Sequence, residues 1–485
     1  MILLDEFYKD LYMNVFKKWI CMQENPNYII KEHKDFIQIE SSYGIAEVAF
    51  NLYCIIELKV VSKKKNEIDF YLHFQMNTLK HAVSLFNEML ESLLKLSDEA
   101  KTKVLLCCSG GLTTSYFARE INEANKLLKN AIEVSAVGYN QLYQIGKQFD
   151  IIFLAPQISY LHAQIQSILK EQVVLKIPPL VFARYDVGTM IKDIEQEQAQ
   201  IKKTKQIKKE EISLKLKITN KKPIVCLVIY KNKERIHIVY RIYDKGMMLL
   251  QNEIIKYTIH IQDIYDLIDT LIIQYPKISI ISLSLPGIID QGKVFSTYIE
   301  GIENINLEEK LKQRYKQQIT LYNDINSATA GYYVSHQEKE DLFFIFQAIS
   351  LNAGAGAGCI INGKLIEGFS SFAGEVSYLP LQLSHSLEEL SKTPQGALEI
   401  LSKMIMSAMC IVAPHIIVVF SELLPDLSAL EEKVKEMMPN HQIPKLIKVD
   451  NVIEYMLIGQ MVLCPPVPNA SPGSIESTAR LSELS

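Results

Sequence analysis

Residues 101–195 alternate between short apolar runs and longer segments with helical spacing. Such an alternation predicts a parallel sheet with helices on both faces. Functional loops in such sheets lie at the carboxyl ends of strands, so we expect chemistry after the first and third strands, at Cys108 and Pro156-Gln157. The expected strands are Val104–Cys107, Ile132–Val137, Ile151–Ala155 and Val173–Ile177, and the expected helices are Thr114–Lys129, Gln141–Phe149, Tyr160–Glu171 and Val187–Gln200.

The first of these strand ends carries two adjacent cysteines. Residues 104–115 read Val-Leu-Leu-Cys-Cys-Ser-Gly-Gly-Leu-Thr-Thr-Ser, so a strand ends on a thiol and a helix is expected to start near Thr114. Backbone N–H groups and the helix dipole favour a bound anion there, and they lower a thiol pKa from its free value of about 8.5. Cys108 is therefore predicted to be a nucleophile that carries a phosphoryl group. Cys107 lies inside the strand and is expected to be a buried core residue.

The loop after Cys108 has the composition of a phosphate cradle. A phosphoryl group on sulfur carries close to two negative charges and three acceptor oxygens. Glycines let the backbone approach those oxygens, and hydroxyl groups add donors. A low-molecular-weight tyrosine phosphatase also places a cysteine in such a loop, but it needs a loop arginine, and Arg119 comes only inside the helix. The predicted phosphate-binding residues are Ser109, Gly110, Gly111, Leu112, Thr113, Thr114 and Ser115.

Composition narrows the class of protein. A chain of 485 residues is long enough for roughly two to four domains, and 48% hydrophobic with 22% charged residues is typical of globular cores. A net charge of −4 gives no reason to expect nucleic acid as a partner. The eight cysteines form no CxxC pair, so neither a disulfide framework nor a zinc ribbon is predicted. No secretion signal and no run of about 18 uncharged apolar residues is visible. We therefore expect a reduced cytoplasmic protein without a metal or cofactor.

Shifts in composition divide the chain into five parts. Residues 1–97 open with an aromatic-rich helical piece and continue with strands, which predicts a small α+β unit, a sheet with one covering helix. The α/β part at 101–195 is followed by a charged linker rich in Lys, Glu and Gln at 196–222. A second α/β pattern fills 223–464, and a Pro- and Ser-rich tail at 465–485 is expected to be disordered.

The cysteine loop and the sequence Ala-Pro-Gln at 155–157 resemble the lactose/cellobiose-type enzyme IIB component of the bacterial phosphoenolpyruvate-dependent sugar phosphotransferase system. The order of the strands and helices around them is also that of the family. The resemblance implies a four-stranded parallel sheet. It also implies that Cys108 accepts phosphate from a histidine of a IIA component and passes it to a sugar at a membrane IIC component.

The C-terminal part resembles the ROK family of sugar kinases and repressors, which has an actin-like α/β fold. Four motifs occur in the family's order: Leu-Pro-Gly-Ile-Ile-Asp at 285–290, Tyr-Asn-Asp-Ile-Asn at 322–326, Gly-Ala-Gly-Ala-Gly at 354–358 and Ala-Gly-Glu at 373–375. The resemblance implies that Asp324 is the base that takes the proton of a sugar hydroxyl. It also implies that Asn323 and Glu375 hold the sugar.

The same part departs from ROK kinases where those kinases face the nucleotide. The first phosphate loop is replaced by Val-Ile-Tyr-Lys-Asn at 228–232, without the metal-orienting aspartate or the glycines. The second has Asn-Ala-Gly at 352–354 in place of Gly-Thr-Gly, and Phe420-Ser421 replaces a Gly-Gly pair. Phosphoryl transfer from ATP depends on positioning and charge stabilisation. We therefore expect a clamp that holds a sugar without using ATP, and a remnant that binds nothing is the alternative.

These observations favour a phosphoryl carrier of the phosphotransferase system joined to a ROK-like module that senses sugar. Its expected partners are a IIA-type phosphohistidine protein, a membrane IIC component on another chain, and a sugar. Two alternatives stay open: an ATP-dependent ROK sugar kinase, and a non-enzymatic regulator that senses phosphotransferase flux at Cys108 and sugar at the ROK residues. No helix-turn-helix is visible before the ROK-like part, so a DNA-binding repressor is not favoured.

Overall fold

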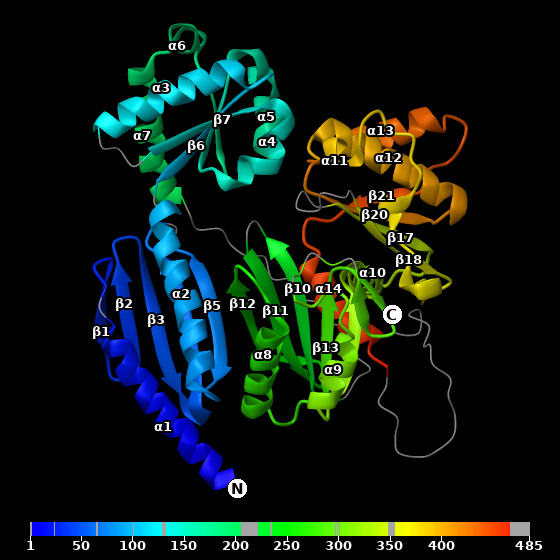
Figure 1. Cartoon of the computed structure of the whole chain (residues 1–485). Coiled ribbons are helices and arrows are strands. Elements are labelled where there is room, and N and C mark those ends of the chain that lie inside the picture. The colour runs from blue at the N-terminus through cyan, green and yellow to red at the C-terminus, as the bar shows by residue number, and fades with distance from the viewer. Residues whose placement is uncertain are drawn as a thin grey trace. The chain divides into compact units, whose positions relative to one another are not determined.

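The computed structural model describes residues 2–23, 25–64, 66–99, 101–128, 132–204, 222–232, 235–295, 297, 299, 301–347 and 355–465. These residues form two compact units (Figure 1). The first unit holds the described residues of Met1–Ala100 and Ile218–Asp324, and the second holds those of Lys101–Lys217 and Ile325–Pro465. Most of the expected linker, most of the expected tail and the second phosphate loop at 352–354 lie outside the described residues.

The first unit is built on a ten-stranded sheet with the order β1-β2-β3-β4-β5-β12-β11-β10-β13-β16. The two halves of this sheet meet where β12 pairs with β5, with Ile255 opposite Tyr71. The pairs β10–β13 and β13–β16 are parallel, and the other neighbours are antiparallel. The strands are β1 (Tyr28–Glu32), β2 (Phe36–Ser41), β3 (Gly44–Asn51), β4 (Ile55–Ser62), β5 (Ile68–Gln75), β10 (Ile224–Asn232), β11 (Arg235–Asp244), β12 (Met247–Lys256), β13 (Ile280–Leu285) and β16 (Gln318–Asn323).

Helices α1 (Ile2–Cys21) and α2 (Leu79–Glu99) lie across the β1–β5 half of the sheet (Figure 1). Their apolar side chains, among them Phe16 and Phe86, share one hydrophobic core with Leu267 of α8 (Ile261–Gln274). We expected a small sheet with one covering helix in this region. The sheet instead has two covering helices and continues into the following strands, because the apolar faces of both halves are buried in the same core. The unit also contains η1 (Leu52–Cys54), β14 (Ile288–Asp290), β15 (Lys293–Phe295) and α9 (Leu307–Arg314).

The second unit begins with a four-stranded sheet of the order β7-β6-β8-β9 in which all neighbours are parallel. One face is covered by α3, α6 and α7 through residues such as Phe117 and Met190, and the other by α4 and α5 through residues such as Leu142 and Ile165. The predicted parallel sheet with helices on both faces is confirmed. The elements are β6 (Thr102–Cys108), α3 (Leu112–Leu128), β7 (Ile132–Gly138), α4 (Tyr139–Ile145), η2 (Gly146–Gln148), β8 (Ile151–Leu154), η3 (Pro156–Leu161), α5 (His162–Ile168), β9 (Val173–Lys176), α6 (Pro179–Arg184) and α7 (Val187–Thr204).

The rest of the second unit is a five-stranded sheet, β19-β18-β17-β20-β21, with helices packed on it. Helices α10 and α14 touch so closely that a Cβ on Gly331 would lie 1.9 Å from the carbonyl oxygen of Tyr455, so glycine is required at this crossing. The elements are α10 (Asp324–Ser335), β17 (Leu342–Gln347), β18 (Gly356–Ile361), β19 (Lys364–Leu365), η4 (Phe369–Ser371), η5 (Val376–Tyr378), α11 (Leu387–Leu390), α12 (Pro394–Ile411), β20 (Ile416–Ser421), α13 (Ser428–Met437), β21 (Lys445–Lys448) and α14 (Ile453–Leu463).

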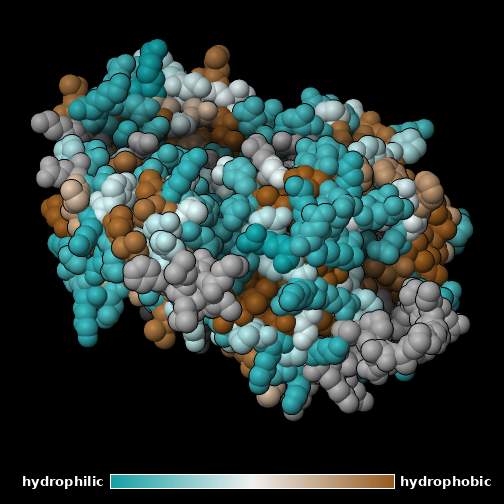
Figure 2. Space-filling view, turned by 60° about the horizontal axis from the view of Figure 1, so that its bottom comes forward, coloured by the Kyte–Doolittle hydropathy of each residue, from teal (hydrophilic) through white to brown (hydrophobic). Residues whose placement is uncertain are grey.

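The surface carries mainly hydrophilic residues on the face shown in Figure 2, with separate apolar patches between them. Among the described residues, no helix is both long and apolar enough to cross a membrane. The same residues contain no group of three or more His, Cys, Asp or Glu side chains placed to hold a metal ion.

Candidate functional site

Cys108 is the last residue of β6, which lies between β7 and β8 in the parallel sheet. Only Ser109, Gly110 and Gly111 separate it from α3, which begins at Leu112, two residues before the predicted start. The connections that leave β6 and β7 run to opposite faces of the sheet, so the carboxyl end of β6 is at a switch point of the topology. Ligand sites in open α/β sheets form at such points.

The Cys108 sulfur lies within hydrogen-bond distance of polar groups of its own loop. The backbone N–H of Gly111 donates to Sγ at 3.0 Å, and the Thr114 hydroxyl lies 3.2 Å from Sγ. The Thr113 hydroxyl is farther away, at 3.9 Å. Thr114 is fully buried and Cys108 is 2% exposed, whereas Ser109, Gly110, Thr113 and Ser115 are exposed. The sulfur therefore lies at the floor of a loop whose other polar groups face outward.

The two adjacent thiols have different ionisation behaviour. Burial alone would raise the pKa of the Cys108 thiol, but the Thr114 hydroxyl and the N–H groups of Gly111 and Gly110 outweigh it, so the pKa is lowered. Burial raises the pKa of the Cys107 thiol to about 12. Cys107 belongs to the apolar core on the α4 side of the sheet. Only Cys108 is therefore poised to become a thiolate, the nucleophilic form.

Gly111 gives the loop its shape. Its φ of +86° lies in the left-handed region, and a Cβ at this position would lie 3.1 Å from the backbone nitrogen of Gly138. Gly110 differs, because a Cβ there would meet no atom within 4 Å. The Thr114 and Ser115 hydroxyls both donate to the Gly111 carbonyl oxygen, at 3.0 and 2.8 Å. The loop is therefore braced at Gly111 and open at Gly110, where a phosphate could approach.

The packing of the loop against Gly138 was not anticipated from the sequence. Gly138 ends β7 and pairs with Cys108 in the parallel register. A Cβ on Gly138 would lie 2.9 Å from the Asn140 side-chain oxygen and 3.5 Å from the carbonyl carbon of Gly110. A glycine directly after a predicted strand is the sequence signal that could have indicated this close approach.

The residues implied by the ROK resemblance fall in both units. Asn323 ends β16 and donates from Nδ2 to the Gly287 carbonyl at 2.9 Å, and Asp324 begins α10 as a buried residue. Glu375 belongs to the second unit, where burial raises the pKa of its carboxyl group. The structure thus brings Asn323 and Asp324 together at the end of one strand.

The segment expected to replace the first phosphate loop continues as strand. Tyr230 and Asn232 belong to β10, and Asn232 pairs with Arg235 of β11 in a hairpin. The Tyr230 hydroxyl donates to Glu253 at 3.1 Å, and His237 lies 2.6 Å from the same carboxylate. These side chains rigidify a β-ribbon where a kinase needs a glycine-rich turn.

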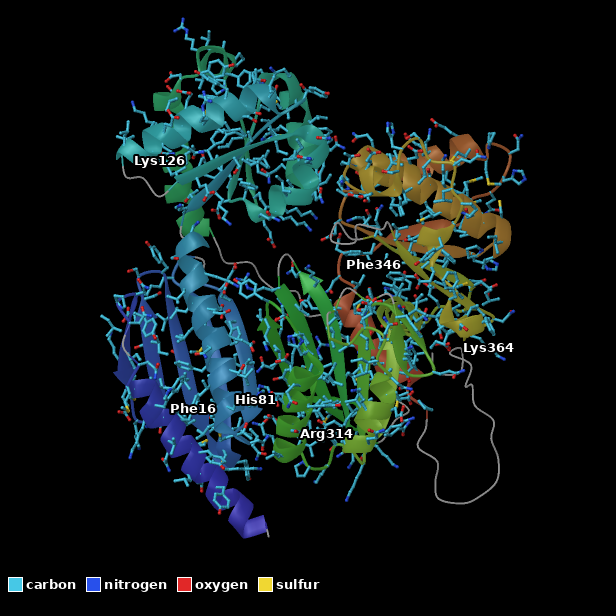
Figure 3. The ribbon with its side chains drawn as sticks, in the orientation of Figure 1. Phe16, His81, Lys126, Arg314, Phe346 and Lys364 are labelled. Atoms are coloured by element: carbon cyan, nitrogen blue, oxygen red, sulfur yellow. The ribbon has the colours of Figure 1, made fainter. Side chains whose placement is uncertain are left out.

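The late strand β20 also differs from a glycine-lined nucleotide site. The ring of Phe420 stacks on Phe346, labelled in Figure 3, with centroids 4.9 Å apart. Ser421 is buried and its hydroxyl donates to the side-chain oxygen of Gln347 at 2.8 Å. Both side chains are therefore fixed in place at the end of this strand.

Comparison with known protein families matches two segments of the chain. Residues 103–196 match the family described as "PTS system, Lactose/Cellobiose specific IIB subunit", and residues 237–393 match the ROK family. The chain combines a IIB domain with a ROK domain. Its fold class is accordingly a IIB-type parallel sheet joined to an actin-like ROK α/β domain. The resemblances inferred from the cysteine loop and from the four ROK motifs are confirmed.

Individual relatives cover separate parts of the chain. The xylose repressor of Bacillus subtilis is 28% identical over 105 residues, which is 21% of this chain and 27% of that protein. The dual regulator NagC of Escherichia coli is 31% identical over 107 residues, 21% of this chain and 25% of its own length. The oligo-beta-mannoside-specific EIIB component of B. subtilis is 30% identical over 65 residues, 13% of this chain and 63% of that protein. The chain thus spans about a quarter of the length of the repressors it matches.

Solved structures give matches of the same two kinds. A ROK family protein from Streptococcus pneumoniae in complex with sucrose has 16% identity and a TM-score of 0.41, and the match covers 49% of this chain and 96% of that one. A lactose-specific IIB component from S. pneumoniae has 21% identity and a TM-score of 0.19, and the match covers 20% of this chain and 96% of that one.

Proposed function

We propose that this protein is a phosphoryl carrier of the phosphoenolpyruvate-dependent sugar phosphotransferase system. Cys108 accepts a phosphoryl group from a IIA-type phosphohistidine protein and passes it on toward a sugar, which is taken up by a membrane IIC component on another chain. The observation that carries the proposal is the Cys108 sulfur held by the Gly111 N–H and the Thr114 hydroxyl, with a lowered pKa, inside a segment that matches the IIB family.

The chemistry requires a thiolate and a site for the phosphate oxygens. The Cys108 thiolate attacks the phosphorus of phosphohistidine, so that an S–P bond forms as the N–P bond breaks and the imidazole leaves and takes up a proton. In the second transfer a sugar hydroxyl attacks the phosphorus of phosphorylated Cys108. An O–P bond forms as the S–P bond breaks, which restores the thiolate, and the hydroxyl proton goes to a base of the protein that holds the sugar. This is the reaction of the IIB component of a protein-N(pi)-phosphohistidine–sugar phosphotransferase.

The loop supplies the groups that would hold the transferred phosphate. The backbone N–H groups of Gly110, Gly111 and Thr114 interact with the sulfur, and the helix dipole adds a favourable field. The exposed hydroxyls of Thr113 and Ser115 can reach oxygens on the outer side. The Thr114 hydroxyl has a single hydrogen, which can be donated either to the Gly111 carbonyl oxygen or to the sulfur. A negative charge on the sulfur favours donation to the sulfur.

The test is phosphorylation of the full chain by phosphoenolpyruvate with the general phosphotransferase proteins and a IIA-type protein. Intact-mass measurement is expected to show one added phosphoryl group, which peptide mapping assigns to Cys108. Cys108→Ser is expected to remove it. Absence of the added mass in the wild-type chain, or its persistence in Cys108→Ser, would overturn the proposal.

We further infer that the ROK domain binds a sugar without phosphorylating it. Asn323 and Glu375 would contact the sugar hydroxyls, and Asp324 would be a retained carboxylate that corresponds to the base of ROK kinases. The β10–β11 ribbon at Tyr230 favours this function over an ATP-dependent kinase. The matches to a xylose repressor and to an N-acetylglucosamine repressor support sugar recognition.

A panel of hexoses, amino sugars and disaccharides distinguishes these functions. A sugar-dependent rise in the melting temperature without ATP turnover in a coupled assay supports the sensor, since a ligand that binds only the folded state raises its apparent stability. Turnover of ATP that is lost in Asp324→Asn would instead establish a kinase.

A further inference from the structure

The IIB domain packs against the ROK part of the same compact unit. The contact surface is formed by α4 and η2 on the IIB side, and by the first turn of α12 together with the two residues after β20 on the ROK side. Ala397 of α12 and Leu423 after β20 are fully buried in the same apolar core as Leu142 of α4 and Leu105 of β6. This core is continuous across the two domains, so the contact excludes water.

Polar groups at the edge of this core fix how the two domains meet. The Tyr139 hydroxyl donates to the side-chain oxygen of Gln395 at 3.4 Å. Lys147 of η2 forms an ion pair with Glu422. The surface defined by Tyr139, Leu142 and Lys147 on one side, and by residues 395–397 and 422–423 on the other, is called the IIB–ROK contact below.

The IIB–ROK contact begins one residue away from the strand end that supports the cysteine loop. Gly138 pairs with Cys108, and Tyr139 is the next residue along the chain. The loop is tight against Gly138, because even a Cβ on Gly111 would lie 3.1 Å from the Gly138 nitrogen. A displacement of the loop toward the sheet must therefore move Gly138 and the start of α4.

Phosphorylation of Cys108 changes the contacts of Gly111, the loop residue that lies against Gly138. Cys108 is 2% exposed, and its sulfur is already in contact with the Gly111 N–H and the Thr114 hydroxyl. A phosphoryl group adds three oxygens and close to two negative charges at this point. The hydrogen bond from Tyr139 to Gln395 is long for an O–H···O contact, so a small shift of α4 is enough to break it.

We propose that the IIB–ROK contact transmits the phosphorylation state of Cys108 to the ROK domain, by loosening the start of α12 when the phosphoryl group is present. This inference rests on the proposed function for the occurrence of phosphorylation at Cys108. The new element is that the ROK domain of the same chain responds to phosphorylation of Cys108. The ROK domain then responds to phosphotransferase activity without a separate regulatory protein.

The contact itself is tested first, with the unphosphorylated full chain and amide hydrogen exchange followed by mass spectrometry. Lys147→Glu places like charges together and is expected to speed exchange in peptides that cover the start of α12 by about five-fold. The charge swap Lys147→Glu with Glu422→Lys is expected to restore the wild-type rate. Lys126→Glu, an equal charge change at an exposed residue near the end of α3 (Figure 3), is the matched control and is expected to leave these peptides unchanged.

The signal is tested with the chain phosphorylated at Cys108, as verified by intact mass. Exchange at the start of α12 is expected to become about five-fold faster than in the unphosphorylated chain. Tyr139→Phe is expected to abolish this difference and to leave Cys108 phosphorylation unchanged. Unchanged α12 exchange in a phosphorylated chain overturns this inference and leaves the phosphoryl-carrier function standing, whereas a chain that takes up no phosphate overturns both.

Discussion

Replacement of Thr114 by valine is expected to shift the reactivity of Cys108 to higher pH. Valine has nearly the same shape but lacks the hydroxyl that lies 3.2 Å from Sγ. Thr114 is fully buried, so water cannot replace the lost donor. A hydrogen bond to a charged acceptor contributes about 1.5–3 kcal/mol, and sulfur is a weak acceptor, so we take the low end of this range. Because about 1.4 kcal/mol is a factor of ten in an equilibrium constant, the thiolate fraction at a fixed pH below the midpoint is expected to fall about ten-fold.

The assay is alkylation of the folded chain by iodoacetamide across a pH series. The rate is read from the Cys108 peptide by mass spectrometry, because Cys21 and Cys410 are also exposed and will react. A thiolate of higher pKa is intrinsically more nucleophilic, so the pH midpoint of the profile is a better measure than a single rate. Circular dichroism checks that the variant is folded.

Thr113→Val is the matched control for this prediction. The Thr113 side chain is exposed and its hydroxyl lies 3.9 Å from Sγ, so its removal is expected to move the profile little. Overlapping profiles for wild type and Thr114→Val would refute the assignment of Thr114 as the main side-chain donor. An equal shift in Thr113→Val would refute the distinction between the two hydroxyls.

Three further predictions concern the loop, the first unit and the ROK domain. Gly111→Ala is expected to lower the free energy of unfolding by about 1–2 kcal/mol in chemical denaturation, because φ of +86° is unfavourable for alanine. It is also expected to slow Cys108 phosphorylation, and a variant with wild-type stability and rate would contradict this. The hydrogen bond that the His81 ring donates to the Asp266 carboxylate raises the pKa of His81. The pair therefore stabilises the fold below the unfolded His pKa of about 6.5, and this stabilisation is lost as pH rises through the folded pKa. Asp266→Asn should therefore lower the free energy of unfolding more at about pH 6 than at about pH 8.5. Urea unfolding followed by the fluorescence of Trp19, the single tryptophan, measures this, and an equal loss at both pH values would count against the pair. Glu375→Gln is expected to abolish any sugar-dependent rise in melting temperature, and an undiminished rise would exclude Glu375 from the sugar site.

Local sequence patterns were enough to predict the parallel sheet and the cysteine loop. The strands at 104–107 and 151–155 are continuous apolar runs, as expected for strands covered on both faces. The groups around Cys108 all come from the next six residues, so their spacing could be interpreted without knowledge of the fold. The early start of α3 was missed because Gly111, with its positive φ, completes the turn in fewer residues than we assumed.

Pairings between distant parts of the chain could not be predicted in the same way. Strand β12 was missed because its first half is exposed and its pattern does not alternate. Its partner β5 lies far away in sequence, so the extension of the ROK sheet by the N-terminal strands left no local signal. Strand β18 was not predicted, because its first residues belong to the glycine-rich motif at 354–358. Gly358 is needed inside this strand, since a Cβ there would lie 2.1 Å from the Thr329 hydroxyl oxygen. The contact of Tyr139 with Gln395 likewise depends on tertiary packing alone.

The central claim is that one of two adjacent thiols carries phosphate, and the pair Cys107→Ala and Cys108→Ala tests it most directly. Each variant and the wild-type chain are incubated with phosphoenolpyruvate, the general phosphotransferase proteins and a IIA-type protein, and the added phosphoryl group is quantified by intact mass. Cys107 is fully buried with a pKa raised to about 12, whereas the pKa of Cys108 is lowered. We predict that Cys107→Ala takes up one phosphoryl group and that Cys108→Ala takes up none. Phosphorylation that survives in Cys108→Ala, or disappears only in Cys107→Ala, would contradict the account.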